Sequence, residues 1–218
     1  MPLYRGSRRI IMSRRVSSSG APAGYSFRGV GQSSASGSVT NFSIDIGAAS
    51  ADRLVVVGVG FQGVAGITSV IVDPAGANVT LAQDAINASG NTSTLYSGLV
   101  TSGSGAKNIE VTLVSGSFLI RAVSVWTLTG LSSNLKKQSS AFAGTTGNIN
   151  VAAGDFLFAM AHHVGGTVTF SGSTEAPAAA HNTGNATDDA ADWTVVATNA
   201  SFALVPGSSS NVAAATYR

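Results

Sequence analysis

The chain has 218 residues, a formal net charge of +2, 44% hydrophobic residues, only 10% charged residues and no cysteine. The absence of cysteine excludes a disulfide framework and thiolate metal sites, and the hydrophobic fraction excludes an intrinsically disordered chain. No segment approaches the ~20 apolar residues of a membrane helix, so we expect no membrane partner.

The positive charge is concentrated at the N-terminus. Residues 1–28 contain six arginines and no acidic residue, whereas residues 29–218 contain six basic and ten acidic residues, a net charge of −4. Residues 1–24 lack regular periodicity and end in SSSGAPAG, a composition typical of flexible linkers. We therefore predict an extended basic anchoring arm and linker over residues 1–24. The partner-anchoring residues predicted in the arm are Tyr4, Arg5, Arg8, Arg9, Ile10, Ile11, Arg14 and Arg15.

Three roles are open for this arm. Its arginines can neutralise the phosphates of a nucleic acid with salt-dependent affinity. They can instead dock on an acidic protein surface while Ile10, Ile11 and Met12 become buried, or the arm can stay a solvated tail. The apolar residues among the arginines favour docking on a protein. They form too short a run for a signal peptide, so we expect synthesis in the cytoplasm without one.

From Tyr25 onward, short apolar runs alternate with Gly, Ser, Asn and Asp turns, a pattern typical of antiparallel strands. Strands are predicted at residues 38–46, 53–60, 67–73, 77–82, 93–100, 107–114, 117–128, 154–162, 166–171, 193–202 and 211–217. Ile109, Val111 and Leu113 alternate with polar residues, which indicates a half-buried strand. The continuous runs RLVVV and DFLFAM indicate central strands that are buried on both faces.

No window of 11 residues shows a helical stripe, and the acidic stretch near 188–191 offers at most one helical turn. Residues 25–218 are therefore predicted to form one all-β domain, a single antiparallel β-sandwich that is jelly-roll-like. The segments ADRLVVVGVG and GDFLFAMAHH both place an Asp before an apolar run, which suggests the same type of strand in opposed positions. Their flanking segments do not align, so the sequence predicts no internal repeat.

A G-x-G-x-x-G motif occurs at Gly58, Gly60 and Gly63, and Asp73 closes the following strand. A dinucleotide site needs these glycines to open a helix, with the acidic residue about 20 residues further on. Only residues 64–69 separate the motif from the next predicted strand, too few for a crossover helix. We interpret the motif as a hairpin turn.

Candidate groups for metal binding or catalysis are few. His162 and His163 are adjacent at a strand end, so their side chains point to opposite faces and cannot easily hold one metal ion. The other candidate ligands are His181, Asp188, Asp189 and Asp192. Their spacing matches no known metal motif, and the chain contains neither a cysteine nucleophile nor a G-x-S-x-G elbow. We predict no metal site, no cofactor and no enzymatic activity.

Four stretches resemble sandwich domains of phage and prophage structural proteins: SADRLVVVGVGF, ITSVIVDPAGANVTLAQ, TSTLYSGLVTSGSGAKNIEVTLVSG and IRAVSVWTLTGLSS. Together they span about residues 50–133. With the basic arm and the cysteine-free body, the chain is similar to tailed-phage virion accessory proteins, namely head decoration, collar and fibre proteins. The likeness lies in the pattern and includes no diagnostic motif, so it implies a class and transfers no functional residue.

The resemblance implies a structural virion protein, made in the host cytoplasm, which the arm attaches to capsid, portal or neck proteins. It also implies that the protein forms a homo-oligomer, for example a trimer. Two alternatives stay open. An icosahedral jelly-roll coat protein would turn its arm toward nucleic acid, and a carbohydrate-binding adhesin module would expose an aromatic platform. Trp126 and Trp193 lie in apolar strand patterns, which favour burial in the core.

Overall fold

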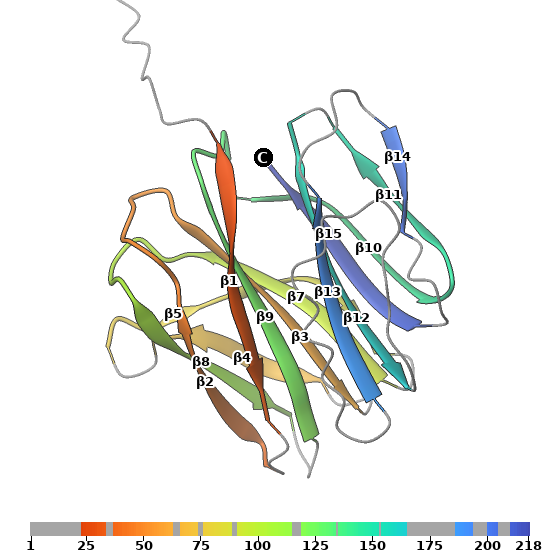
Figure 1. The fold of residues 1–218 in the computed structure, drawn as a ribbon, viewed down its shortest axis with the longest axis horizontal. Coiled ribbons are helices and arrows are strands. Elements are labelled where there is room, and N and C mark those ends of the chain that lie inside the picture. Colours follow the sequence, from red (N-terminus) through yellow and green to blue (C-terminus); the bar gives the residue numbers. More distant parts are fainter. Residues whose placement is uncertain are drawn as a thin grey trace, which may run out of the picture.

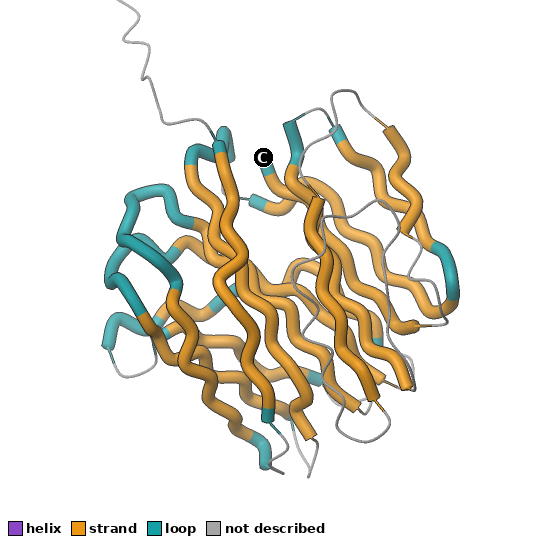
Figure 2. The backbone as a smooth tube through the Cα atoms, in the orientation of Figure 1, coloured by secondary structure: helices purple, strands orange, loops and turns teal. Residues whose placement is uncertain are grey.

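The computed structural model describes residues 23–33, 37–62, 66–73, 76–88, 91–114, 119–133, 135–152, 154–164, 186–193, 200–204 and 210–218. These residues form strands and loops and contain no helix (Figure 2). Every described strand pairing is antiparallel. The predicted all-β class is therefore confirmed. In the described part of the chain, nothing has the helical length and apolar character needed to span a bilayer.

The strands form four sheets, which follow one another across the body in the order B, A, C and D (Figure 1). Sheet A contains, in spatial order, β1 (Gly24–Gln32), β9 (Leu119–Thr129), β3 (Leu54–Gln62), β7 (Asn91–Leu99) and β6 (Ala82–Asn87). Sheet B contains β2 (Val39–Asp45), β8 (Ala106–Leu113), β4 (Ile67–Val72) and β5 (Val79–Thr80). Sheet C contains β10 (Lys136–Gly144), β15 (Ser210–Tyr217), β12 (Phe156–Val164) and β13 (Ala186–Trp193). Sheet D contains β11 (Gly147–Val151) and β14 (Ala200–Leu204).

Three hydrophobic cores separate these four sheets. One core lies between sheets A and B, and Phe42 and Phe61 belong to it. A second core, called here the seam core, lies between sheets A and C and contains Trp126 and Phe158. The third lies between sheets C and D. A single sandwich of two sheets is therefore not confirmed, because sheet A carries a core on each of its faces.

The composition of β3 explains how sheet A can be buried on both faces. Successive side chains of a strand point to opposite sides, so Val55, Val57 and Val59 enter the core with sheet B. Leu54 and Val56 enter the seam core instead. The prediction that this strand is central and buried on both faces is confirmed, and the same holds for β12.

The strands pair in a nested order, and this order occurs twice along the chain. In the first unit, β1 to β9, the pairs are β1 with β9, β2 with β8, β3 with β7 and β4 with β5. In the second unit, β10 to β15, the pairs are β10 with β15, β11 with β14 and β12 with β13. The two segments that share an Asp before an apolar run begin β3 and β12, which hold equivalent positions in this order. The pairing scheme repeats although the sequence does not.

Several boundaries differ from the predictions. Of the strand predicted at 193–202, Trp193 ends β13 and residues 200–202 begin β14, whereas residues 194–199 lie outside the described residues. The stretch near 188–191 lies in β13 and not in a helical turn. Five strands, β1, β6, β10, β11 and β13, were not predicted apart from one terminal residue each of β6 and β13. Of these, β1, β6, β10 and β13 lie at the edges of sheets A and C, where few apolar residues are needed. The arm residues 1–22 and the strand predicted at 166–171 lie outside the described residues.

Because the seam core joins both units, we predict that Phe158→Ala destabilises the whole body. The Phe158 ring contacts Tyr25, Trp126 and Tyr217. Its loss should lower the free energy of unfolding by about 3–5 kcal/mol, in one cooperative transition measured by urea denaturation and circular dichroism. Leu135→Ala is the control, because Leu135 is 72% exposed and should change stability by less than about 0.5 kcal/mol. Two separate transitions, only one of them shifted, would contradict a shared core.

Candidate functional site: the base of the arm

The predicted anchoring residues, from Tyr4 to Arg15, lie outside the described residues, so the structure brings none of them into a site. It does describe the point where the arm joins the body. β1 begins at Gly24, which pairs with Thr129 at the end of β9. The C-terminus lies at the same end of the body (Figure 1), where the amide of Ser133 donates to the carbonyl of Arg218 (2.7 Å). We call this end the arm end.

Aromatic side chains fasten the first residues of β1 to the seam core. The Tyr25 ring meets the rings of Phe156 and Phe158 edge-on, with centroid distances of 5.7 and 5.8 Å. The Phe27 ring lies 6.0 Å from that of Trp126. Edge-on and tilted aromatic pairs add stability beyond the area that they bury. The chain is therefore packed against both units within a few residues of leaving the arm.

The next residue, Arg28, occupies a β-bulge. The register of β1 against β9 shifts between Phe27 and Gly29, which leaves Arg28 as the extra residue. Its Nε donates a hydrogen bond to Thr127 Oγ1 (2.6 Å). Its guanidinium lies against Gly47, where an added Cβ would come within 2.5 Å of Nη2. Gly47 also has φ +76°, a left-handed conformation that favours glycine at this position.

Arg53, directly before β3, is a charged side chain that is only 1% exposed. Its guanidinium donates hydrogen bonds to the backbone carbonyls of two separate connections at the arm end. The acceptors are Ile46, Gly47, Ala48, Val100, Ser102 and Gly103, at distances from 2.7 to 3.4 Å. Three belong to the connection after β2 and three to the residues after β7. One side chain thus ties two connections together.

The environment of Arg53 is electrostatically demanding, because all six of these acceptors are neutral carbonyls. Burial, and secondarily the positive charge of Arg28, lowers the pKa of Arg53. Arginine tolerates such a site better than lysine does, because its planar fork offers five donors and its pKa starts far above neutrality. The hydrogen bonds offset the cost of removing the charge from water.

In each unit, one aspartate at the arm end binds the residue that follows the last strand of that unit. Asp52 Oδ2 accepts from the amide of Gly130, the residue after β9 (2.6 Å), and Oδ1 accepts from the hydroxyl of Ser50. The hydrogen bond from Ser50, followed by that from Gly130, lowers the pKa of Asp52. In the second unit, Asp155 Oδ1 accepts from Nε of Arg218, the residue after β15 (2.7 Å). The Asp that precedes each apolar run therefore fastens the end of a unit.

A third aspartate, Asp84, lies where the edges of sheets A and C meet. It is the extra residue of a bulge between Gln83 and Ala85 in β6. Its Oδ2 accepts from the hydroxyl of Tyr217 in β15 (2.5 Å), and its carbonyl accepts from Lys136 Nζ (3.0 Å). Burial is the main cause of its raised pKa. Because this carboxylate joins the two units, we interpret it as structural.

Two cavities flank Asp84. One of about 350 Å³ is lined by Gln83, Ser139 and Ser140, among others. The other, of about 320 Å³, is lined chiefly by Leu99, Leu135 and Lys136. Asp84 borders both cavities and is the one carboxylate that the described residues contribute to either lining. Within the described part of the chain, these linings therefore hold no pair of carboxylates of the kind that glycoside hydrolysis needs.

The G-x-G-x-x-G motif does not form a dinucleotide site. Gly58 and Gly60 lie inside β3, Gly63 lies outside the described residues, and the next described element is a strand. The hairpin interpretation is also wrong, because β3 belongs to sheet A and β4 to sheet B. Gly58 has a packing role: a Cβ there would lie 3.2–3.3 Å from atoms of the Met160 side chain across the seam.

The histidines and tryptophans are placed only in part. His162 and His163 lie near the end of β12, opposite Asp188 and Thr187 of β13, and the His162 side chain is 1% exposed. His181 lies outside the described residues. Within the ranges given above, no three His, Asp or Glu side chains gather closely enough to hold a metal ion. Trp126 is fully buried, as predicted, and Trp193 is the last residue of β13.

No protein family model matches the chain, and no match was found among curated proteins or solved structures.

Sequence reasoning missed the charged residues that organise the arm end: Arg28, Arg53, Asp52 and Asp155. One signal was present, since DR and GD directly precede the two most apolar strands. A charged side chain directly before a buried strand is itself largely buried. It therefore needs hydrogen-bond partners from the loops at that end of the sheet. The identity of these partners depends on which loops meet there.

We predict that Arg53→Met lowers the free energy of unfolding by about 3 kcal/mol or more, because several buried carbonyls lose their donor together. Arg53→Lys should restore only part of the loss, since one ammonium cannot reach both connections. Urea denaturation gives both values. Lys137→Met is the matched control, because Lys137 is exposed. A loss of less than about 1 kcal/mol for Arg53→Met would contradict the proposed role.

The raised pKa of Asp84 predicts a pH dependence of stability. Between its ordinary value of 3.8 and its raised value, the folded state holds a proton that the unfolded chain has released. This contribution to stability is complete below the ordinary value and is lost as the pH rises through the raised one. The free energy of unfolding of the wild type, relative to Asp84→Asn, should therefore fall as the pH rises above 3.8. A parallel pair of profiles would show that Asp84 does not titrate this way.

Proposed function

We propose that this chain is a non-enzymatic structural virion protein, a capsid decoration, collar or fibre component. In this proposal the N-terminal arm anchors the protein to capsid, portal or neck proteins, and the β-sandwich body projects from the particle. The observation that carries the proposal is the rigid base of the arm. A basic segment of 22 residues precedes Ala23, and Tyr25, Phe27 and Arg28 lock the chain that follows it into the body.

An anchored body is pulled at the residue where its anchor enters, so an anchoring protein needs that residue to be firmly held. Here β1 is held by a ladder to β9, by aromatic contacts across the seam core and by the Arg28 hydrogen bond. Arg53 and Asp52 brace the loops around the same point. A tail without a mechanical role would need no such base.

The topology of the first unit supports a jelly-roll interpretation. Eight of its strands pair first with last, inward to the central pair, and fall into the orders β1-β9-β3-β7 and β2-β8-β4-β5. A long hairpin wrapped into two sheets in this way is a jelly roll, with β6 as an added edge strand. Jelly rolls are frequent in viral capsid proteins and in lectins, so the fold supports the class by analogy and does not choose among its members.

The charge distribution supports docking of the arm on protein. The arm carries a net charge of +5 over residues 1–22, whereas residues 23–218 carry seven basic and ten acidic residues, a net charge of −3. Opposite charges favour association between arm and body surfaces, and added salt weakens this attraction. The apolar Ile10 and Ile11 supply burial that a purely phosphate-binding arm would not need.

We predict that the purified full-length chain forms discrete small oligomers and does not form closed shells of many copies. Light scattering and negative-stain imaging give the assembly state. Closed shells would overturn the proposal in favour of an icosahedral coat protein.

Two arm variants separate docking on protein from binding to nucleic acid. Arg8→Glu with Arg9→Glu removes attraction to phosphates and to acidic protein surfaces alike, whereas Ile10→Ser with Ile11→Ser removes only the apolar contacts. Co-purifying nucleic acid, detected by absorbance, that is lost with the first variant but kept with the second would favour the coat alternative. Lys137→Glu is the charge control on the body.

A further inference from the structure

The sheets of this protein differ in how their outer edges are protected. An unpaired edge strand offers a row of free amides and carbonyls, and most proteins blunt such edges with bulges, charges or short strands. In sheets A, B and C, the described edge strands are β1, β6, β2, β5, β10 and β13. Bulges interrupt β1, β6 and β10. β5 has two residues, and β13 has three aspartates among its eight residues.

β2 is the exception among these edges. It pairs with β8 over seven consecutive residues with no shift of register. It contains no proline and no basic residue, and its single charge is Asp45 at its last position. Its outward side chains, from Val39 to Asp45, are exposed at every second residue. Among the described residues β2 has no strand on its other side, so a regular edge is open to another extended segment.

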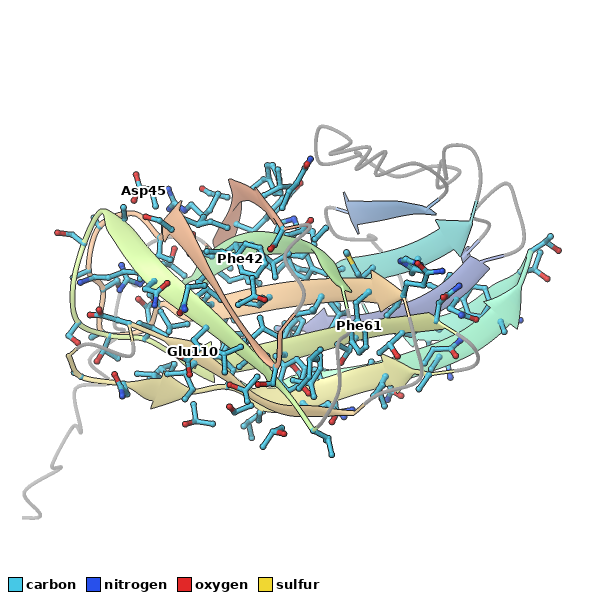
Figure 3. All side chains as sticks on the ribbon, turned by 90° about the horizontal axis from the view of Figure 1, so that it is seen from below. Phe42, Asp45, Phe61 and Glu110 are labelled. Atoms are coloured by element: carbon cyan, nitrogen blue, oxygen red, sulfur yellow. The ribbon has the colours of Figure 1, made fainter. Side chains whose placement is uncertain are left out.

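Two carboxylates lie on the strands at this edge. Asp45 lies at the margin of the body, whereas Phe42 and Phe61 lie in its interior (Figure 3). On the neighbouring strand β8, Glu110 is paired with Asn41 of β2. The base on β8, Lys107, already has a partner in Asp73 at 3.1 Å. Among the described residues, the carboxylates beside the edge are therefore Asp45 and Glu110, and the Arg28 guanidinium lies near Gly47, just past the end of β2.

We propose that the edge of β2 binds the N-terminal arm of a neighbouring copy of this chain as an added strand. This inference rests on the anchoring role proposed above and names a second copy as a partner of the arm. The arm combines Ile10, Ile11 and Met12 with flanking arginines and contains no acidic residue. Backbone pairing would supply affinity, and the arginines would meet Asp45 and Glu110.

The position and length of the arm suit this edge. β1 packs on β2 so closely that a Cβ at Gly31 would lie 2.3 Å from the Phe42 ring. A Cβ at Gly29 would lie 3.8 Å from Ile44, so β1 runs antiparallel to β2. The arm therefore leaves the body at the end where Asp45 lies, several residues beyond the end of β2. Its 22 residues can span up to about 70 Å when extended, whereas the seven residues of β2 cover only about 23 Å.

A neighbouring copy is a better donor than the same chain. An arm that turned back onto its own β2 would run parallel to it, because β1 leaves the arm end and β2 returns to it. An arm from another copy can pair antiparallel, which is the more stable arrangement per residue. Arm exchange of this kind is a heterologous contact, which closes into a ring when the rotation between copies permits.

The absence of cysteine allows a direct test. One preparation of the full chain carries only Ser13→Cys in the arm, and a second carries only Ser43→Cys on the exposed side of β2. The two are mixed, treated with a short bismaleimide and run on a denaturing gel, so that a mixed dimer can form only between copies. Ser139→Cys on the exposed edge strand β10 replaces Ser43→Cys in the control.

The proposal expects a mixed dimer with Ser43→Cys and little with Ser139→Cys. It also expects Ser43→Lys, which places a base beside the arm arginines, to reduce the size of the oligomer or to weaken its association roughly fivefold, whereas Ser139→Lys does not. Circular dichroism and the urea midpoint confirm that each lysine variant is folded.

Two results would overturn the inference and leave the proposed function standing. One is equal cross-linking at Ser43→Cys and Ser139→Cys, with discrete oligomers still present. The other is a link formed only within a single chain that carries both Ser13→Cys and Ser43→Cys. Closed shells of many copies would instead overturn the proposed function itself.

Discussion

Sheet A has to exclude water on both faces, and most of the architecture follows from that constraint. A strand buried on one side can alternate apolar and polar residues, but β3 cannot, and its first eight residues are buried. Its two faces supply both the core with sheet B and the seam core with sheet C. Since the seam core includes Leu54 and Trp126 from the first unit and Phe158 from the second, neither unit can keep its burial without the other.

This shared sheet also explains where the charged residues lie. With both faces of β3 and β12 apolar, charges are confined to the ends of these strands, and Arg53 and Asp155 stand there, each 1% exposed. Each is satisfied by segments that must reach the arm end for the fold to close: two connections for Arg53, and the C-terminal Arg218 for Asp155. The hydrogen bonds of Arg53 and the ion pair of Asp155 can form only when the two nested units have closed correctly. They contribute more to the specificity of the fold than to its net stability.

The sequence predicts the interior better than the edges, for a physical reason. In a sheet protein, continuous apolar runs such as RLVVV and DFLFAM are stable only as central strands buried on both faces. The strands that contain them were therefore located to within about two residues. The edge strand β10 reads KKQSSAFAG, which is equally typical of a loop; it is a strand because β15 offers it a partner. The same limit applies to the site, since no local pattern tells which carbonyls will surround Arg53. The repeated pairing order is invisible in sequence because it depends on partners far apart in the chain.

The contrast among the edges links the fold to assembly. Bulges at Arg28 and Asp84 turn extra side chains toward Thr127 and Tyr217, so the same irregularities that block further pairing also tie the units together. β2 has neither device, and its last residue, Asp45, lies toward the end of the body where the 22 residues before Ala23 join it. An open regular edge carries a risk of uncontrolled association, and it is tolerable when a dedicated segment covers it. In the arrangement proposed above, the N-terminal segment of a second copy would be that dedicated segment, so the open edge and the basic segment would be parts of one assembly contact.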